Sequence, residues 1–492
     1  MTDFTELPDL AAERLGGTVI HANDEFFAEK ENLLLAKPAI FIADRYTDRG
    51  KWMDGWETRR RRTPGHDFAV VRLGLAGVVR GVVVDTAFFK GNFPESCSIE
   101  ACCLDRDPQA EDTAESTRWI EILPRSILAG DSANLFTVDS PLRFTHLRLN
   151  IFPDGGVARL RVHGEPMPHW PAVSARLDLA ALANGAWVVA ASDRFFGPPH
   201  SLGLPGPSIG MHDGWETRRR RGPGHDWVIV RLATEGVVES ACVDTSHFKG
   251  NAPGSCTLEG CSSPDRVPRA DVAWHALAPE SPLQPNTVHD FNDLVAGSAI
   301  THARLAIYPD GGVARLRLYG AATERGRVEA SLRWLNALPP LAAATELSAC
   351  CAAKSWARAV TAARPFATLE ELHAASAQAA RDMGREDLLE AFSAHATLGQ
   401  LSESHGSNQE QAGASLASPE TRTRLSELNR RYAERFGYVF LLSATGKSGD
   451  EMATQCAARL DNEAARELEI AAAELHKITA LRLQKLLGGS PK

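Results

Sequence analysis

A long internal repeat is the feature of this sequence that most constrains its fold. The segment DGWETRRRR occurs at residues 54–62 and again, letter for letter, at residues 213–221. Around it, GWETRRRRTPGHDFAVVRL (55–73) matches GWETRRRRGPGHDWVIVRL (214–232), at an offset of 159 residues. A period near 160 residues is too long for a solenoid unit and has the size of a duplicated domain. We therefore expect two copies of one domain in tandem.

Each copy has the composition of β-structure. The strings DFAVVRL and DWVIVRL carry the Val, Ile and aromatic content of buried strands. Further on, RFTHLRLNIFPDGGVARLRVHG (143–164) matches AITHARLAIYPDGGVARLRLYG (299–320), and Pro-Asp-Gly-Gly between two alternating runs indicates a hairpin. Many short strands with Gly and Pro turns predict two tandem all-β sandwiches of the jelly-roll type, at residues 17–185 and 186–325.

The C-terminal third of the chain has a different composition. After about residue 330, alanine and leucine dominate and the alternating strand pattern stops. Pro339, Pro340 and Pro365 interrupt a pattern that is otherwise helical. We expect an all-α domain at residues 331–492.

Composition and charge exclude several classes of function. The formal net charge of −9 argues against a nucleic-acid binder, which normally has a basic face, and so against that interpretation of the arginine runs. No run approaches the roughly 18 apolar residues of a membrane span. The segment MTDFTELPDLAAERLGG has no apolar core typical of a secretory signal, and nine cysteines without such a signal indicate reduced thiols. We expect a cytoplasmic protein with neither nucleic acid nor membrane as partner.

The arginine runs allow two interpretations. On a strand, side chains alternate between faces, so Arg59 and Arg61 would share one face and Arg60 and Arg62 the other; the same holds for residues 218–221. Two guanidinium groups on one face can bind a carboxylate bidentately. The alternative is a solvated sheet edge whose charges discourage aggregation. The residues alone leave both open.

Other polar side chains recur in both copies near the arginine runs. A set of this kind can bind a small polar anion and transfer protons. Taken singly, each is more typical of a structural role, such as an aspartate that caps a backbone N–H. The set comprises His66 with Asp67, Asp85, Lys90, Asn92 and Glu100 in the first copy, and His225 with Asp226, Asp244, Lys249, Asn251 and Glu259 in the second.

The repeated cysteines indicate packing rather than metal binding. Cys97 and Cys102 are five residues apart, as are Cys256 and Cys261. On a strand, an odd spacing places two side chains on opposite faces, which does not suit chelation of one metal. We expect buried packing residues and predict no cofactor, and the sequence leaves open whether a divalent metal assists.

The duplicated motifs resemble those of allantoicase. The resemblance rests on DGWETRRRR, on VDTSHFKGN with SCTLEG, and on PDGGVARLRLYG, and it covers about 300 residues. That family consists of two similar jelly-roll repeats, galactose-binding-like in fold, and hydrolyses allantoate to ureidoglycolate and urea. The substrate-binding positions that the resemblance implies include Glu57, Arg59, Arg60, Glu216, Arg218, Arg219, Asp244, Lys249 and Asn251.

Allantoate suits this set of side chains. Its carboxylate sits on a carbon that holds two ureido groups, so an arginine pair would anchor it. A general acid must protonate the departing urea and a base must deliver water. His225, with Asp226 beside it, is our candidate proton carrier, as is His66 in the other copy. The sequence leaves open which repeat holds the working site.

The helical third resembles 2-oxo-4-hydroxy-4-carboxy-5-ureidoimidazoline (OHCU) decarboxylase. The motifs LLEAFSAHATLG, SNQEQAGA and LNRRYAERFGYVFLLSATGKS occur in the family's order over about 155 residues. That family is all-helical, needs no cofactor, and forms (S)-allantoin with loss of CO2. Its usual His-Pro is here His395-Ala396. The resemblance implies His395 and Glu410 as catalytic residues, Ser407 and Gln411 as substrate contacts, and Tyr438 and Leu442 as the wall that faces the ring.

Together these observations predict a bifunctional enzyme of purine catabolism. Its substrates are small molecules, and both resembled families self-associate, so we expect a homo-oligomer. An alternative from another class is a jelly-roll protein that binds a small ligand without chemistry and carries a degenerate helical dimerisation domain.

Overall fold

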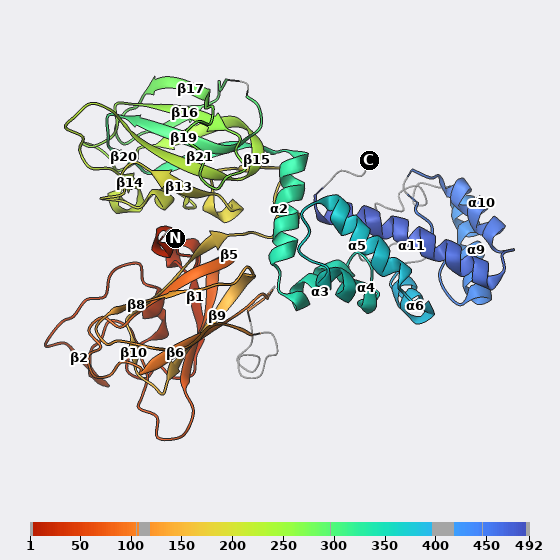
Figure 1. The fold of residues 1–492 in the computed structure, drawn as a ribbon, viewed down its shortest axis with the longest axis horizontal. Coiled ribbons are helices and arrows are strands. Elements are labelled where there is room, and N and C mark those ends of the chain that lie inside the picture. Colours follow the sequence, from red (N-terminus) through yellow and green to blue (C-terminus); the bar gives the residue numbers. More distant parts are fainter. Residues whose placement is uncertain are drawn as a thin grey trace. The chain divides into compact units, whose positions relative to one another are not determined.

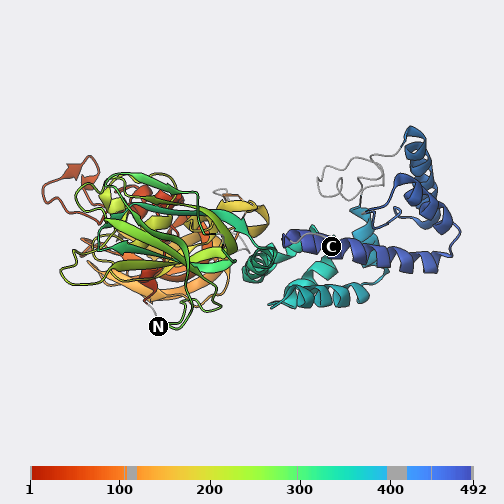
Figure 2. The ribbon, with the colours of Figure 1, turned by 90° about the horizontal axis from the view of Figure 1, so that it is seen from above.

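The computed structural model describes residues 3–104, 106–107, 119–295, 297–395, 418–444 and 446–488. The chain divides into two compact units, Met1–Pro339 and Pro340–Lys492. The first is rich in strands and the second is helical (Figures 1 and 2). Within the described residues, no helix has both the length and the apolar character needed to cross a membrane.

The first repeat is organised around one long strand, β5 (Asp67–Asp85). Its first half pairs with β9, and β9 continues through β6 to β7; its second half pairs with β11 and β8. The pairing with β9 shifts register between Arg72 and Gly77. One strand therefore contributes to both layers of a sandwich. Its partners are β1 (Thr18–Ala22), β6 (Ser96–Cys102), β7 (Ile120–Ile127), β8 (Ala133–Thr137), β9 (Arg143–Phe152) and β11 (Arg159–Pro166).

The second repeat has the same topology around β15 (Asp226–Asp244). Each of its strands except β12 has a counterpart strand in the first repeat, which confirms the predicted pair of β-sandwiches. These strands are β12 (Arg176–Asp178), β13 (Trp187–Ala191), β16 (Ser255–Cys261), β17 (His275–Pro282), β18 (Val288–Phe291), β19 (Ile300–Tyr308) and β21 (Arg315–Ala322).

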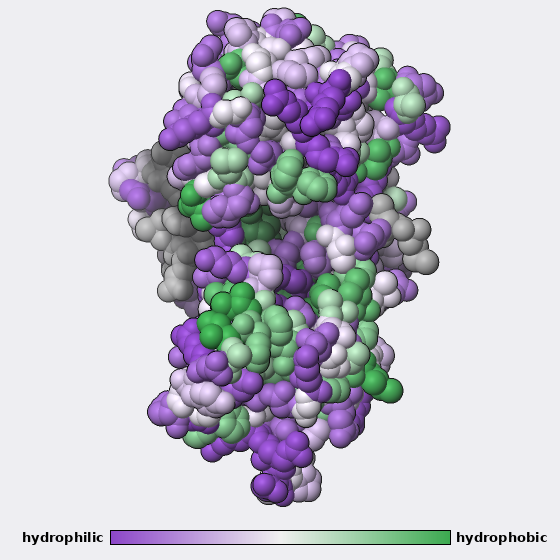
Figure 3. Space-filling view, turned by 90° about the vertical axis from the view of Figure 1, so that its left-hand side faces the viewer, coloured by the Kyte–Doolittle hydropathy of each residue, from purple (hydrophilic) through white to green (hydrophobic). Residues whose placement is uncertain are grey.

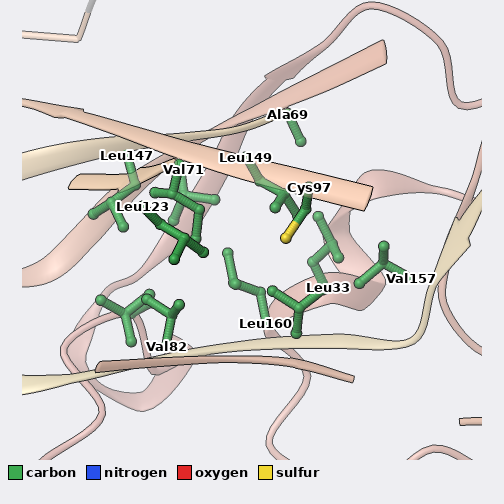
Figure 4. Packing of buried hydrophobic residues seen from close by; sticks show 14 of the residues in the cluster. Leu33, Ala69, Val71, Val82, Cys97, Leu123, Leu147, Leu149, Val157 and Leu160 are labelled. Carbon is green, nitrogen blue, oxygen red and sulfur yellow. The ribbon is translucent and has the colours of Figure 1, made fainter. Parts of the chain in front are cut away.

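Apolar side chains fill the space between the layers of the first repeat. Figure 4 shows Val71, Leu147 and Leu149 of one layer pointing toward Val82 and Leu160 of the other. All five are fully buried. Burial of this kind stabilises the folded state by about 25 cal/mol per Å² of apolar surface. The resulting core supports the loops that carry the site.

The repeated cysteines belong to the two cores. Cys97, Cys102, Cys256 and Cys261 are buried and form no disulfide. Burial raises the pKa of the Cys97 and Cys256 thiols to about 12, so both stay protonated. Their predicted role in packing is confirmed.

A single helix, α2 (Glu324–Ala337), packs on the second repeat. The Thr323 side chain caps it by accepting from Gly326 N, and Thr234 Oγ1 donates to the Gly326 carbonyl at 2.6 Å. A Cβ at Gly326 would lie 2.4 Å from the Glu235 carbonyl oxygen, so glycine permits this close approach. Arg327 donates to two carbonyls of the segment that joins the repeats, at residues 173 and 174.

The second unit consists of helices, as the sequence predicts. The residue ranges of its described helices are α3 (Pro340–Ser348), α4 (Lys354–Ala362), α5 (Leu369–Arg381), α6 (Arg385–Ser393), α9 (Pro419–Phe436), α10 (Gly449–Arg459) and α11 (Ala464–Leu486). Pro365 lies between α4 and α5, where it interrupts the helical pattern.

Candidate active sites

The aspartate that begins the repeated DGWETRRRR motif stabilises the fold of each repeat. Asp54 binds Arg159 at 2.9 Å and Asp213 binds Arg315 at 2.6 Å, with both arginines buried. A buried guanidinium needs a partner of opposite charge, because an unpaired buried charge is strongly unfavourable. The aspartate of the motif therefore has a structural role in each repeat.

The next two letters are structural as well. A Cβ at Gly55 would lie 2.7 Å from the Val157 carbonyl oxygen, so only glycine fits. The Trp56 indole is fully buried and donates to the Asp24 carbonyl at 2.8 Å. In the second repeat, Trp215 donates in the same way to Asp193 at 2.9 Å.

The expected alternation of arginines along a strand is wrong. The strand β4 (Trp56–Glu57) ends before the first arginine. Further along, Arg61 N donates to the Asp154 carboxylate at 2.8 Å and not to a neighbouring strand. Arg59 and Arg61 do not share one carboxylate: Arg59 binds Asp24 at 2.7 Å, and Arg61 binds Asp67 at 2.5 Å. Both arginines therefore bind acids of the same repeat.

The second repeat has the same arrangement, which leaves alternate arginines without partners. Arg218 binds Asp193 at 2.7 Å, and Arg220 binds Asp226 at 2.5 Å. Among the arginines of the two motifs, four are exposed and have neither a hydrogen bond nor an ion pair through the guanidinium group within the described residues: Arg60, Arg62, Arg219 and Arg221. Of the arginines that sequence analysis singled out, Arg60 and Arg219 therefore remain available to an anion.

The motif's glutamate makes one contact that both repeats share. Asn92 Nδ2 donates to Glu57 Oε1 at 2.7 Å, and Asn251 Nδ2 donates to Glu216 Oε1 at 2.5 Å. Burial raises the pKa of Glu57, and the hydrogen bond from Asn92 opposes that shift. A carboxylic acid that keeps its proton closer to neutral pH is suited to acid–base chemistry.

In the first repeat this pair lies in a pocket of about 540 Å³. Lys51 and Lys90 bring positive charge to it, and aromatic side chains form much of the remaining wall. A pocket of this volume accommodates a small ligand, with a few polar groups to orient it. The lining residues are Phe27, Phe41, Gly50, Lys51, Met53, Glu57, Phe88, Lys90, Gly91 and Asn92.

A loop present at full length only in the first repeat forms one wall of this pocket. Between Leu35 and Asp54 there are 18 residues, whereas the equivalent stretch between Leu204 and Asp213 has eight. The longer loop contains the hairpin of β2 (Tyr46–Thr47) and β3 (Gly50–Lys51). The two repeats therefore differ directly above the same Glu–Asn pair.

The residue beneath that loop differs between the repeats accordingly. Phe88 stacks on Phe41 of the long loop, with ring centroids 5.7 Å apart. Its counterpart His247 instead donates from Nε2 to the Ser208 carbonyl of the short loop, at 2.9 Å. Both residues have positive φ, so the backbone is alike and only the side-chain partner has changed.

The long loop also exposes apolar side chains to solvent. Ile40, Phe41, Ile42 and Tyr46 are between 41% and 68% exposed. Figure 3 shows the side of the strand-rich unit that carries β2, where hydrophobic patches interrupt a hydrophilic surface. Apolar side chains beside a pocket mouth are typical of a ligand-binding loop.

Other predicted residues of the repeats make structural contacts. The His225 ring packs on Tyr308 at 4.7 Å, while Asp226 accepts from Arg220 and Ser192. Asp244 is buried, and its carboxylate accepts from Ser246 N at 2.7 Å, which is the capping role considered for such an aspartate. Lys249 is exposed and has no ion-pair partner among the described residues.

In the helical unit, His395 directly follows α6. Its backbone N donates to the Phe392 carbonyl at 3.0 Å, and its side chain is half-buried. The Phe392 ring packs on Tyr438 with centroids 5.0 Å apart. The ring that contacts Tyr438 therefore belongs to the residue three positions before His395. The predicted Ser407, Glu410 and Gln411 lie outside the described residues, as does Ala396.

The predicted wall is a non-helical segment, residues 437–444, between α9 and α10. Tyr438 and Leu442 are buried in it. The Tyr438 hydroxyl makes no hydrogen bond within the described part of the chain, and burial raises the pKa of this phenol. Arg459 Nη1 donates to the Leu441 carbonyl at 2.8 Å, and Glu474 accepts from Ser443 N at 2.7 Å, so two side chains hold the wall in place.

The family model for the allantoicase repeat matches residues 8–167 and 177–323 of this chain. The chain belongs to the allantoicase family. A probable allantoicase 2 of Burkholderia pseudomallei is 50% identical over 320 residues, which are 63% of this chain and 94% of that relative. A probable allantoicase of Nocardia farcinica is 51% identical over 320 residues, covering 64% and 95%.

A solved allantoicase structure and a second family model complete the comparison. The crystal structure of allantoicase from Saccharomyces cerevisiae is 36% identical, with a TM-score of 0.55, and covers 64% of this chain and 93% of that chain. The family model for OHCU decarboxylase matches residues 336–484. The chain therefore joins an allantoicase region to an OHCU decarboxylase domain, and both resemblances are confirmed.

Sequence analysis missed the long loop of the first allantoicase repeat and the lysine it carries, Lys51. The signal was present, because the two copies match on either side of that loop but differ by ten residues within it. An insertion next to a repeated motif is often functional, since loops tolerate length changes and carry binding residues.

Sequence analysis also missed a buried charge network in the OHCU decarboxylase domain. Glu467 is fully buried and accepts from Arg459, Asn462 and Tyr432. It lies four residues before Ala471 on the buried side of α11, so a glutamate at a core position was the available signal. Within the described residues, no three His, Cys, Asp or Glu side chains are grouped closely enough to hold a metal ion.

Proposed function

We propose that this chain catalyses two steps of ureide metabolism in purine catabolism. Its allantoicase repeats hydrolyse allantoate to ureidoglycolate and urea, and its helical domain decarboxylates OHCU to (S)-allantoin. The observation that supports the first activity best is the Glu57–Asn92 pair in a cationic pocket of about 540 Å³.

Glu57 is the group best suited to proton transfer in the first reaction. Burial raises its pKa, which favours a protonated carboxyl group that gives its proton to a ureido nitrogen as the C–N bond breaks. The carboxylate formed then takes a proton from the water that attacks the same carbon. Urea leaves, and the hydroxyl that stays on carbon completes ureidoglycolate. Asn92 orients the carboxyl group throughout.

The substrate's carboxylate is matched by the cations of the pocket. Lys51 and Lys90 line it, and Lys90 has only a long contact of 3.7 Å with Asp131, so its charge is available. Arg60 remains our predicted additional anchor, because it has no partner within the described residues while Arg59 is bound to Asp24. We propose the first repeat as the working site, since its long loop encloses the Glu–Asn pair.

In the OHCU decarboxylase domain, loss of CO2 leaves an electron pair on a ring carbon. His395 delivers a proton to one face of that carbon, which accounts for a single enantiomer of the product. Glu410 accepts hydrogen bonds from the ureido N–H groups, while Ser407 and Gln411 contact the substrate. The buried wall at Tyr438 and Leu442 excludes water from the ring.

Two assays on the full-length chain test both activities. Urea release from allantoate and CO2 release from OHCU are measured for the wild type, for His395→Ala and for Glu57→Gln. We expect His395→Ala to abolish CO2 release and to spare urea release, and Glu57→Gln to do the reverse. Saturable binding of allantoate by the wild type without urea release would instead support the ligand-binding alternative.

A further inference from the structure

A second pocket, of about 230 Å³, lies where the two repeats meet α2. Three arginines line it: Arg231 from β15, Arg266 from the loop after β16, and Arg333 from α2. Its other side is formed by the segment around Glu165 at the end of the first repeat. Neither proposed reaction uses any of these groups.

The three guanidinium groups have no acid bound to them. None makes a hydrogen bond or an ion pair through its side chain within the described residues. Two acids, Glu165 and Glu329, are close enough to act on these arginines electrostatically, but each has another partner. Glu165 binds Arg80 at 3.2 Å, and Glu329 lies 4.0 Å from Arg325. Three like charges line one pocket and repel each other; Arg266 and Arg333 are exposed, so solvent screens part of this repulsion, and a bound anion would offset the rest.

The first repeat shows what this place looks like when the charges are balanced. Arg72, the counterpart of Arg231, binds Asp107 at 2.9 Å. The matching segments are DRDP (105–108) and DRVP (265–268), so the second repeat carries Val267 in place of Asp107, and Arg231 has no such ion pair within the described residues. The second repeat lacks the internal acid at the point where the pocket opens, and a bound anion would replace it.

Two further observations indicate a ligand. Trp187 lines the pocket and is 4% exposed, and its indole N–H has no acceptor among the described residues. A buried donor without an acceptor costs about 1–3 kcal/mol, so an acceptor in the pocket would be stabilising. Burial, together with the repulsion of Arg333 and Arg266, lowers the pKa of Arg231 to about 10.

We propose that this pocket binds a small dianionic oxyanion, of the phosphate or short dicarboxylate kind, through Arg231, Arg266 and Arg333. A dianion offsets more of the three charges than a monoanion does. The volume lies below the roughly 300–1,000 Å³ of sites for drug-sized ligands, which limits the occupant to a small molecule. Arginine suits it because its planar donors bind carboxylate and phosphate bidentately. The bound anion connects the second repeat to α2.

Titration calorimetry on the full-length chain tests this inference, with inorganic phosphate and malonate as separate probes at constant ionic strength set by chloride. We expect saturable binding of at least one probe, which also distinguishes phosphate from dicarboxylate. Arg231→Gln should weaken that binding by roughly ten- to a hundredfold, the value of one or two charge-assisted hydrogen bonds. The matched control Arg72→Gln changes the same position of the first repeat and should leave the affinity unchanged.

A second variant keeps the test decisive if Arg231→Gln is poorly folded. Arg266→Asp replaces one of the three cations with an acid, so it should lose anion binding, and its melting temperature shows that it is folded. Absence of saturable binding by the wild type, or wild-type affinity in Arg266→Asp, would overturn the proposal. Urea and CO2 release do not enter these readouts, so the result is independent of the proposed activities.

Discussion

Glu57 and Asn92 are joined by a hydrogen bond of 2.7 Å in a walled pocket of the first repeat, and Glu216 and Asn251 make the same bond beneath a shorter loop. The duplicated fold thus presents one polar pair twice in two different surroundings. The difference arises from the loop and from the residue beneath it, Phe88 or His247, because the glutamate and the asparagine occupy equivalent positions in both repeats.

Replacement of Glu57 by Gln should stabilise the protein at neutral pH. The folded-state pKa of Glu57 is raised above its ordinary value of 4.5, so the native state binds its proton more tightly than the unfolded state does. The free energy of unfolding of the wild type therefore falls as pH rises from about 4.5 through the folded-state pKa. Glu57→Gln removes this loss, and thermal melts of both proteins from acidic to neutral pH should diverge as pH rises. Parallel curves would contradict the raised pKa.

The two residues beneath the loops should differ in importance. Phe88→Ala removes the stacking with Phe41 in the pocket wall and should raise the KM for allantoate by roughly 2- to 10-fold, the value of an aromatic pair. His247→Ala, the matched change in the second repeat, should leave KM unchanged. Steady-state urea release measures both. An equal rise in the two variants would mean that both repeats work.

Arg60 should matter more for substrate than its neighbour Arg59. Arg60→Ala removes a guanidinium that has no partner in the described residues, and the KM for allantoate should rise roughly tenfold. Arg59→Ala breaks an exposed ion pair with Asp24 and should cost less than about 1 kcal/mol of stability, with KM little changed. Arg219→Ala reports on the second repeat in the same assay. An unchanged KM in Arg60→Ala would remove that arginine from the site.

Arg459→Met should impair the OHCU decarboxylase domain. It leaves the fully buried Glu467 without its cation, which costs about 3–5 kcal/mol, and it frees the Leu441 carbonyl of the wall. We expect earlier unfolding of this domain in denaturant and reduced CO2 release, with urea release retained.

The control for that prediction is an arginine on the surface of the same domain. Arg430 binds Glu427 and Glu434, and all three side chains are more than half exposed. Arg430→Met should therefore cost less than about 1 kcal/mol and leave CO2 release unchanged. If both variants unfold at the same denaturant concentration, the buried network does not support the wall.

The sequence predicted the elements better than the partners of individual side chains. Alternation in DFAVVRL and the Pro-Asp-Gly-Gly turns were sufficient to predict the sandwiches, because strand faces follow from a local period of two. The arginine run was assigned to a strand in error, since the carboxylate that accepts from the Arg61 backbone, on Asp154, lies 93 residues away in sequence. Likewise, the adjacency of His225 and Asp226 in sequence did not indicate that Asp226 binds Arg220.

The amino-acid sequence alone determined the duplication, the change from strands to helices after the second repeat, and the two families to which the parts belong, because these follow from local patterns and long motifs. Only the tertiary structure decided which copies of a repeated residue keep a free charge. Arg60 and Arg231 owe their availability to the placement of acids from distant segments, and such placement is a property of packing that no local pattern contains.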